Sequence, residues 1–217
     1  MATQVRRWCG VLRPAIPVVL TVVMLGGASG CTTHHQEPSA EPSAKASSAV
    51  PSPTPTAPTS VPLQVRVTRV LGKLPDRARP PLQANIGRTI DAYLHDAFLG
   101  GSYPRSDFGD AFGSFTKGAA SRARHDVDLL TNRSYGASTT AVRATRRTAY
   151  LSVLAPNKVA AGVTARVDLV MQVDRGDRPS QRVRLTGRLL LTRDAHNHWV
   201  IFGYDLARSD TPTGSGS

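Results

Sequence analysis

The sequence is poor in cysteine, and after residue 60 it contains no glutamate. Of the two cysteines, Cys9 lies in an N-terminal segment that we expect to be removed, which leaves Cys31 alone. A chain with one cysteine forms no internal disulfide and keeps no thiol for catalysis, so the folded part must be stabilised by its core. Arginines heavily outnumber lysines, and we interpret this bias, like that of Asp over Glu, as a sign of a GC-rich genome.

Motifs for common chemistries are also missing. No Gly-rich phosphate loop follows a strand, and Ser114, Ser121 and Ser134 have no nucleophile-elbow context. The histidine pairs His34-His35 and His196/His198 lack a third ligand, which argues against a metal site. We therefore expect a protein that is not an enzyme and holds no cofactor or metal.

The chain also lacks a hydrophobic run of transmembrane length. Such a helix needs about 20 apolar residues, and the run at 15–25 is roughly half as long. It follows a basic front with Arg6, Arg7 and Arg13 and precedes small residues, an order typical of a secretory signal peptide. Because the small residues end at Cys31, we predict a lipoprotein signal with diacylglycerol on Cys31; ordinary cleavage after Gly30 is the alternative.

Composition divides the chain into four parts. A stretch rich in Pro, Ser and Thr follows the cysteine and is typical of a semi-extended linker. The remaining length suits one ordinary domain with a core of its own. The predicted parts are a lipoprotein signal peptide at 1–30, a lipid anchor and linker at 31–60, a folded domain at 61–210 and a disordered tail at 211–217.

Helical periodicity dominates the first half of the domain. After an alternating strand at 63–67, apolar residues recur every three or four positions from Leu82 to Phe98, which predicts a helix that Gly100-Gly101 ends. A second, short helix is expected at 108–115. A third, capped by Thr116, is expected to run to Leu130.

Strand periodicity dominates the second half. Apolar and polar residues alternate at 163–173 and 183–191, and hairpin loops are expected at 174–177 and 194–197. The last strand, 199–206, is apolar on both faces, so we expect it inside the sheet. Helices followed by long strands predict an α+β fold, with the N-terminal helices packed on one face of a curved antiparallel sheet.

This order of elements, ending in Trp199-Val200-Ile201-Phe202-Gly203-Tyr204-Asp205, resembles the nuclear transport factor 2-like superfamily over residues 62–208. It is also similar to exported actinobacterial members of that superfamily, and distantly to proteins associated with mammalian-cell-entry lipid importers. The resemblance implies a cone-shaped fold. Because the superfamily includes enzymes, binding modules and scaffolds, it implies no single activity.

Charge predicts a docking surface. The formal net charge of +12 falls to +9 once the three arginines of the signal peptide are removed. Four arginines stand at the polar positions of their alternating strands, so we expect them on the outer face of the sheet, and Arg143 and Arg147 are candidates to join them. Together they would form a site for an anionic partner. These four are Arg166, Arg182, Arg184 and Arg188. A solvated face with salt bridges to Asp168 is the alternative.

The partner expected outside the membrane is an envelope protein, an acidic lipid or a cell-wall polymer. Nucleic acid is not expected, because we place no stacking aromatic residues on this face. The oligomeric state is left open.

Aromatic residues could instead line a ligand pocket between the helices and the sheet, or form its core. The pocket candidates are Tyr93, Phe98, Phe108, Phe112, Phe115, Trp199 and Phe202. An isomerase-like site would need Tyr93 to face a buried carboxylate, either Asp168 or Asp205.

Three functions follow in order of preference. The first is a lipid-anchored, non-enzymatic adaptor or binding module on the extracytoplasmic face of the cell membrane, serving an envelope protein or transport assembly. The second is a carrier of an apolar ligand, and the third is an isomerase-like enzyme.

Overall fold

A computed structural model describes residues 60–213 of the chain. Cys31, the expected signal peptide at 1–30 and nearly all of the expected linker at 31–60 lie outside the described residues. Within this part of the chain, no helix is long and apolar enough to cross a membrane.

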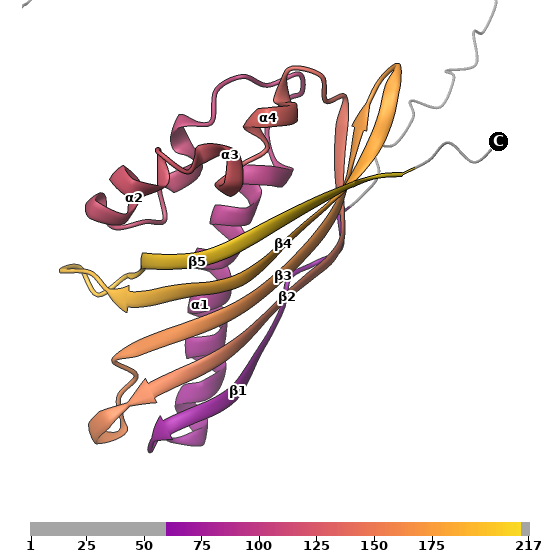
Figure 1. Cartoon of the computed structure of the whole chain (residues 1–217). Coiled ribbons are helices and arrows are strands. Elements are labelled where there is room, and N and C mark those ends of the chain that lie inside the picture. Colours follow the sequence, from indigo (N-terminus) through magenta and orange to yellow (C-terminus); the bar gives the residue numbers. More distant parts are fainter. Residues whose placement is uncertain (1–59, 214–217) are drawn as a thin grey trace, which may run out of the picture. The chain divides into compact units, whose positions relative to one another are not determined.

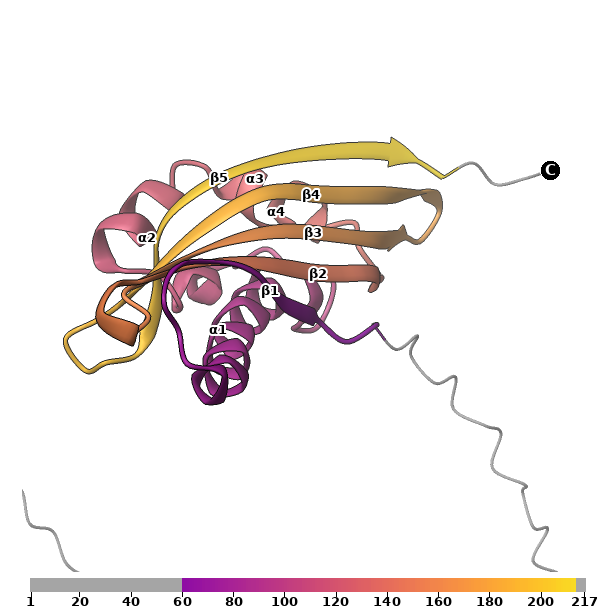
Figure 2. The same ribbon diagram turned by 90° about the horizontal axis from the view of Figure 1, so that it is seen from below.

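The domain is an α+β structure built on one five-stranded sheet (Figures 1 and 2). The strands are β1 (Gln64–Gly72), β2 (Ala141–Ala155), β3 (Gly162–Arg175), β4 (Arg178–Arg193) and β5 (Trp199–Pro212). They lie side by side in sequence order. The prediction of an antiparallel sheet is wrong for β1, which pairs parallel with β2, so the sheet is mixed. The helical segment between β1 and β2 returns the chain to the end of the sheet where β1 began. Two neighbouring parallel strands require such a crossover connection.

The alternating sequence accounts for β2 to β4. Inward positions are apolar and buried, whereas outward positions are polar and partly or fully exposed. Both predicted hairpin loops are confirmed. Gly176 has a φ of 59° in the β3–β4 turn, a left-handed conformation that glycine adopts without strain, and the backbone of Asp194 bonds to that of His198 in the β4–β5 loop.

The long predicted helix is confirmed as α1 (Arg79–Leu94), extended by a π-helical turn η2 (His95–Leu99). Pro80 and Pro81 lie in the first turn, where a missing N–H is tolerated, and Gly100 follows the last turn. Figure 2 shows α1 and the shorter helices beneath one face of the curved sheet. Ile86, Ile90 and Tyr93 of α1 are fully buried in the core that this inner face forms.

The remaining helices are shorter than predicted. The segment 108–115 contains only a 3-10 turn, η3 (Gly109–Phe112), instead of an α-helix. Thr116 caps α2 (Lys117–Ala123) by accepting a hydrogen bond from the Ala119 N–H, as predicted. The helix then stops instead of running to Leu130. Further short pieces complete the segment: η1 (Asp76–Ala78), α3 (Val127–Leu130), α4 (Arg133–Gly136) and η4 (Pro156–Lys158).

The prediction that the last strand lies inside the sheet is wrong, because β5 is an edge strand. Residues 114–116 cover the start of this edge: the Ile201 N–H donates to the Ser114 carbonyl, and the Thr116 N–H donates to the Ile201 carbonyl. The strand also runs to Pro212, so its pairing with β4 extends two residues into the segment expected to be a disordered tail.

Candidate functional site

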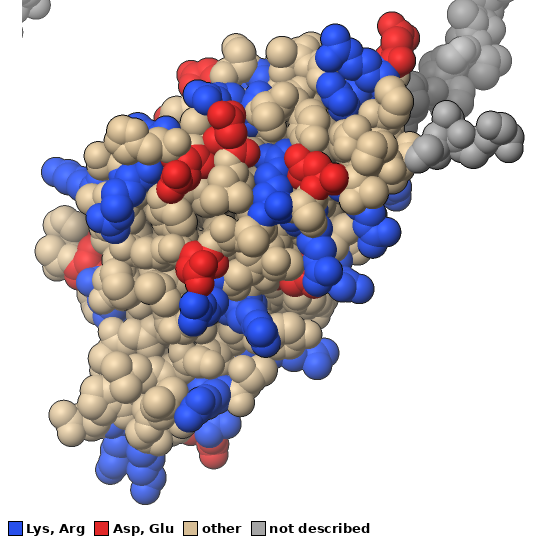
Figure 3. Space-filling model, viewed as in Figure 1, with Lys and Arg blue, Asp and Glu red and all other residues tan. Residues whose placement is uncertain are grey.

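The outer face of the sheet, opposite the helices, carries most of the charged strand residues. Arg166, Arg182, Arg184 and Arg188 all lie on this face and are exposed, at the parity that the alternation predicts. Figure 3 shows basic side chains outnumbering acidic ones on one side of the domain.

Strand register arranges these arginines into rows. One row crosses all five strands, and its members are Arg66, Tyr150, Arg166, Arg188 and Asp205. Like charges directly opposite each other in a sheet are destabilising, and Arg166 faces Arg188 directly. Arg188 is paired with Asp205, whereas Arg166 makes no ion pair with any residue of the described part. A shallow pocket of about 500 Å³ lies here, lined by Tyr150, Arg166 and Arg188 among others.

Arg146 and Arg184, which flank Val170 on the outer face, are better neutralised. Asp168 accepts two hydrogen bonds from Arg184, at 3.0 and 3.2 Å, and one from Arg146 at 3.3 Å. Partial burial acts to raise the pKa of Asp168, but these hydrogen bonds and the two positive charges outweigh it, so the pKa lies below its usual value. Salt bridges therefore neutralise Arg146, Arg184 and Arg188 on the outer face. Arg166 and Arg182 have no acidic partner among residues 60–213.

A β-bulge decides which other arginines join the outer face. The register of β2 shifts between Ala144 and Arg146, which inverts the alternation. Arg143 stays outside and bonds to Gln172. Arg147, named above as a further member of this face, does not join it: Arg147 points inward, is buried and forms an ion pair with Asp91 of α1.

Most of the aromatic pocket candidates lie in the core. Tyr93, Phe98 and Phe115 are buried and meet edge to face, with ring centroids 5.1–6.0 Å apart. Phe108 and Phe112 are also buried and border only a surface pocket of about 280 Å³. Phe112 also meets Phe115 edge to face, and all five side chains belong to the core between the helices and the sheet.

The last two candidates lie at the start of β5. Trp199 points inward and is buried, while its ring borders a surface hollow of about 350 Å³ near the β4–β5 loop. The expectation that Phe202 lines a pocket under the helices is wrong, because Phe202 lies on the outer face and is 43 % exposed. With Tyr150 it also contradicts the expectation that this face has no aromatic residues.

The groups of an isomerase-like site are separated by the sheet. The Tyr93 hydroxyl is buried and donates to the Leu130 carbonyl at 3.0 Å. Burial raises its pKa far above the ordinary value, so the phenol stays protonated. Asp168 lies on the outer face, and a bulge at Phe202 of β5, opposite Leu190 and Leu191, turns Asp205 outward as well, towards Arg188. Neither carboxylate faces Tyr93.

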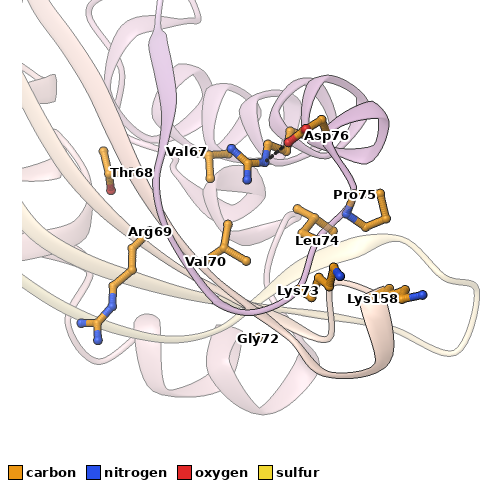
Figure 4. Close-up of a pocket in the computed structure, with 11 residues that line it drawn as sticks. Val67, Thr68, Arg69, Val70, Gly72, Lys73, Leu74, Pro75, Asp76 and Lys158 are labelled. Atoms are coloured by element: carbon orange, nitrogen blue, oxygen red, sulfur yellow. Dashed lines mark ion pairs between the residues drawn. The ribbon is translucent and has the colours of Figure 1, made fainter.

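Two further features were missed by reading the sequence. Arg66 and Tyr150 belong to the same row as Arg166 and Arg188. Alternation within each strand could have indicated their face, but only the strand register shows that they lie in one row. A pocket of about 710 Å³ lies between β1 and the loop to α1, with Lys73 and Lys158 on its rim (Figure 4). Asp76, on its opposite side, is paired with Arg79 at 3.4 Å.

Histidines offer no metal site in the described part. His196 and His198 lie on the β4–β5 loop with ring centroids 6.3 Å apart, and their backbone N–H groups bond to the Asp194 carboxylate. No group of three metal-ligating side chains occurs within residues 60–213.

No protein-family model, curated protein or solved structure matches this chain at a significant level. Function therefore has to be argued from the site itself.

Proposed function

We propose that the protein is a non-enzymatic binding module, anchored to the outer face of the cell membrane by a lipid on Cys31, that acts as an adaptor for an envelope protein or transport assembly. Its docking surface is the basic face, which we define as five of the outward arginines of the sheet: Arg66, Arg166, Arg182, Arg184 and Arg188. The sequence features at 1–31 support the location, and the fold supports the surface.

The observation that carries this proposal is the direct opposition of Arg166 and Arg188, with Arg66 in the same row and Asp205 as the one acid. This arrangement destabilises the unbound protein, because like charges face each other on neighbouring strands. An acidic group placed above Tyr150 would lie between Arg66 and Arg166, beside the pocket that Arg188 also lines, and would offset that repulsion. The charge pattern thus favours an anionic partner, which we take to be an acidic segment of an envelope protein.

The positions of the titratable groups support a function without catalysis. An acid–base site needs two groups on one side of the sheet, whereas Tyr93 lies inside and both carboxylates lie outside, paired with arginines. The close packing of Tyr93, Phe98 and Phe115 favours a core over a carrier cavity.

We also infer a cone-shaped fold of the nuclear transport factor 2-like kind. What supports it is the long helix α1 lying against a strongly curved sheet, with the shorter helices on the same face (Figure 2).

Site-specific photo-crosslinking in intact cells tests the adaptor function. A photoreactive phenylalanine analogue at Tyr150, in the middle of the arginine row, should crosslink to a discrete partner. Arg166→Gln with Arg188→Gln should abolish that product. The matched control Arg124→Gln changes an exposed arginine near α2 and should leave it intact. If the crosslinks persist in the double variant, the basic face is not the docking surface.

A further inference from the structure

One end of the sheet exposes a cluster of apolar side chains. Here β1, β2 and β4 end and β3 and β5 begin. The exposed fractions are 43 % for Leu71, 52 % for Leu154, 61 % for Val159 and 43 % for Phe202. We call these four residues the apolar tip. They are four of the six large hydrophobic side chains exposed in the described part of the chain, so their position at one end of the sheet is a concentration of apolar surface.

Strand pairing and a shared hollow bring Leu71, Leu154 and Phe202 together, and Val159 lies in the connection between β2 and β3 at the same end of the sheet. Leu71 of β1 pairs with Leu154 of β2, which pairs in turn with Gly162 of β3. Leu190 of β4 adds to the same surface beside Phe202. A hollow of about 310 Å³ lies among these side chains, with Ser152 and Thr164 as its polar members.

Positive charge borders the apolar tip. Lys73 follows Leu71 by two residues, and Lys158 directly precedes Val159, so both lysines lie next to apolar members of the tip. They are two of the three lysines among residues 60–213, in a chain that otherwise uses arginine. Figure 4 shows them on the same side of the neighbouring pocket. The acid that lines this pocket, Asp76, is already paired with Arg79.

The connections at this end are held in place by backbone hydrogen bonds. The Lys73 N–H donates to the Ala155 carbonyl at 3.2 Å, which fastens the end of β1 to the end of β2. The Ala161 N–H donates to the Leu154 carbonyl at 2.9 Å and closes the hairpin that carries Val159. The apolar side chains are therefore presented by a formed surface and need no ordering on binding.

We propose that the apolar tip docks on an anionic phospholipid bilayer. Exposed aliphatic and aromatic side chains bordered by lysines are the combination that an interfacial site requires: the apolar groups enter the headgroup boundary and the ammonium groups meet the phosphates. The long lysine stems allow the charges to stay at the headgroup level while the tip enters more deeply. An acidic protein would use the charges but would leave Val159 and Leu154 without a complement.

This inference uses residues outside the basic face and is independent of the anchor at Cys31. A domain that contacts the bilayer through its tip would leave the arginine row free for the adaptor function. The two proposals therefore fail separately.

Vesicle co-sedimentation tests the proposal. The protein is residues 31–217 with Cys31→Ser, so that no acyl chain contributes. The probes are vesicles of phosphatidylglycerol with phosphatidylcholine, and vesicles of phosphatidylcholine alone. We expect clear binding to the anionic vesicles, weakened by salt, and little binding to the neutral ones.

Matched variants locate the contact. Neutralising Lys73 and Lys158 together with glutamine should weaken binding by about fivefold for each lysine. Leu154→Ser with Val159→Ser should also weaken it while leaving its salt dependence in place. Arg178→Gln removes an exposed arginine outside the basic face, at the β3–β4 turn at the other end of the sheet, and should change binding by less than about twofold at comparable ionic strength. All replaced side chains are exposed, and circular dichroism verifies that the variants are folded.

Three results would overturn the proposal: no binding to anionic vesicles at low salt, equal binding to neutral vesicles, or a loss for Arg178→Gln as large as for the lysine pair. The last result would mean that overall charge alone attracts the protein. Loss of vesicle binding with unchanged crosslinking at Tyr150 would remove the tip and leave the adaptor function standing.

Discussion

Asp168 is the acid that pairs with both Arg146 and Arg184 on the outer face of the sheet, and replacing it tests the electrostatic reasoning. Its side chain is 21 % exposed and accepts hydrogen bonds from Arg184 and Arg146 on the two neighbouring strands. Asp168→Asn keeps the size of the side chain and removes the charge. Both arginines are about half exposed, so water screens each pair, and such pairs contribute about 0.2–1 kcal/mol each. We expect the free energy of unfolding at pH 7 to fall by about 1 kcal/mol.

The loss should depend on pH in a defined direction. The pKa of Asp168 is lower in the folded state than in the unfolded state, so its stabilisation is fully present above the unfolded value of about 3.9. It disappears as the pH falls through the folded pKa. The stability difference between wild type and Asp168→Asn should therefore be constant near neutral pH and close to zero in strong acid.

Urea unfolding followed by circular dichroism, at neutral and acidic pH, measures this difference. Asp205→Asn is the control, because Asp205 and Arg188 are both more than 60 % exposed and their separation should cost under about 0.5 kcal/mol. A double-mutant cycle with Arg184→Gln isolates the pairwise contribution. A loss that persists unchanged in strong acid would refute the reasoning, since it could not come from the carboxylate charge.

Three other predictions concern the core and the close approach of strands. Tyr93→Phe should lower the free energy of unfolding by about 1–2 kcal/mol, because the buried Leu130 carbonyl loses its donor, as chemical denaturation would measure. Gly187→Ala should cost roughly 2–4 kcal/mol, seen as a lower Tm, because φ is +137° and a Cβ would lie 2.1 Å from the Asp205 carbonyl oxygen. Phe98→Ala should cost about 3–5 kcal/mol and Phe202→Ala under about 1 kcal/mol; equal losses would contradict the outward position of Phe202.

The inner face of the sheet contributes mainly to stability, whereas the proposed binding surfaces lie on the outer face. The inner face and α1 form the core, whereas the outer face combines paired and unpaired arginines with exposed apolar groups at one end. Variants on the outer face are therefore expected to change binding with little effect on folding, which makes both proposals testable with folded proteins.

Local pattern was sufficient for the elements with strong periodicity. The three- and four-residue spacing from Leu82 to Phe98 predicted α1 and the turn that extends it, and alternation predicted the long strands and both hairpins. The parity of Arg166, Arg182, Arg184 and Arg188 followed from the same alternation, because no bulge interrupts β4 between Arg182 and Arg188.

The helical segment from 108 to 130 was harder to predict. Its apolar residues suit a helix, yet the chain bends after Ala123 and uses short turns that fit beneath the sheet. Packing against the sheet overrides a weak local preference in pieces this short.

The sequence by itself determined the long helix, the long strands of the second half and the faces of uninterrupted strands. Only the tertiary structure decided the parallel pairing of β1, the edge position of β5 and the sides of Arg147 and Asp205. The physical reason is that a bulge adds one residue to a strand and inverts every later side chain, while strand order depends on contacts between residues far apart in the chain. Neither leaves a mark in the local pattern of apolar and polar residues.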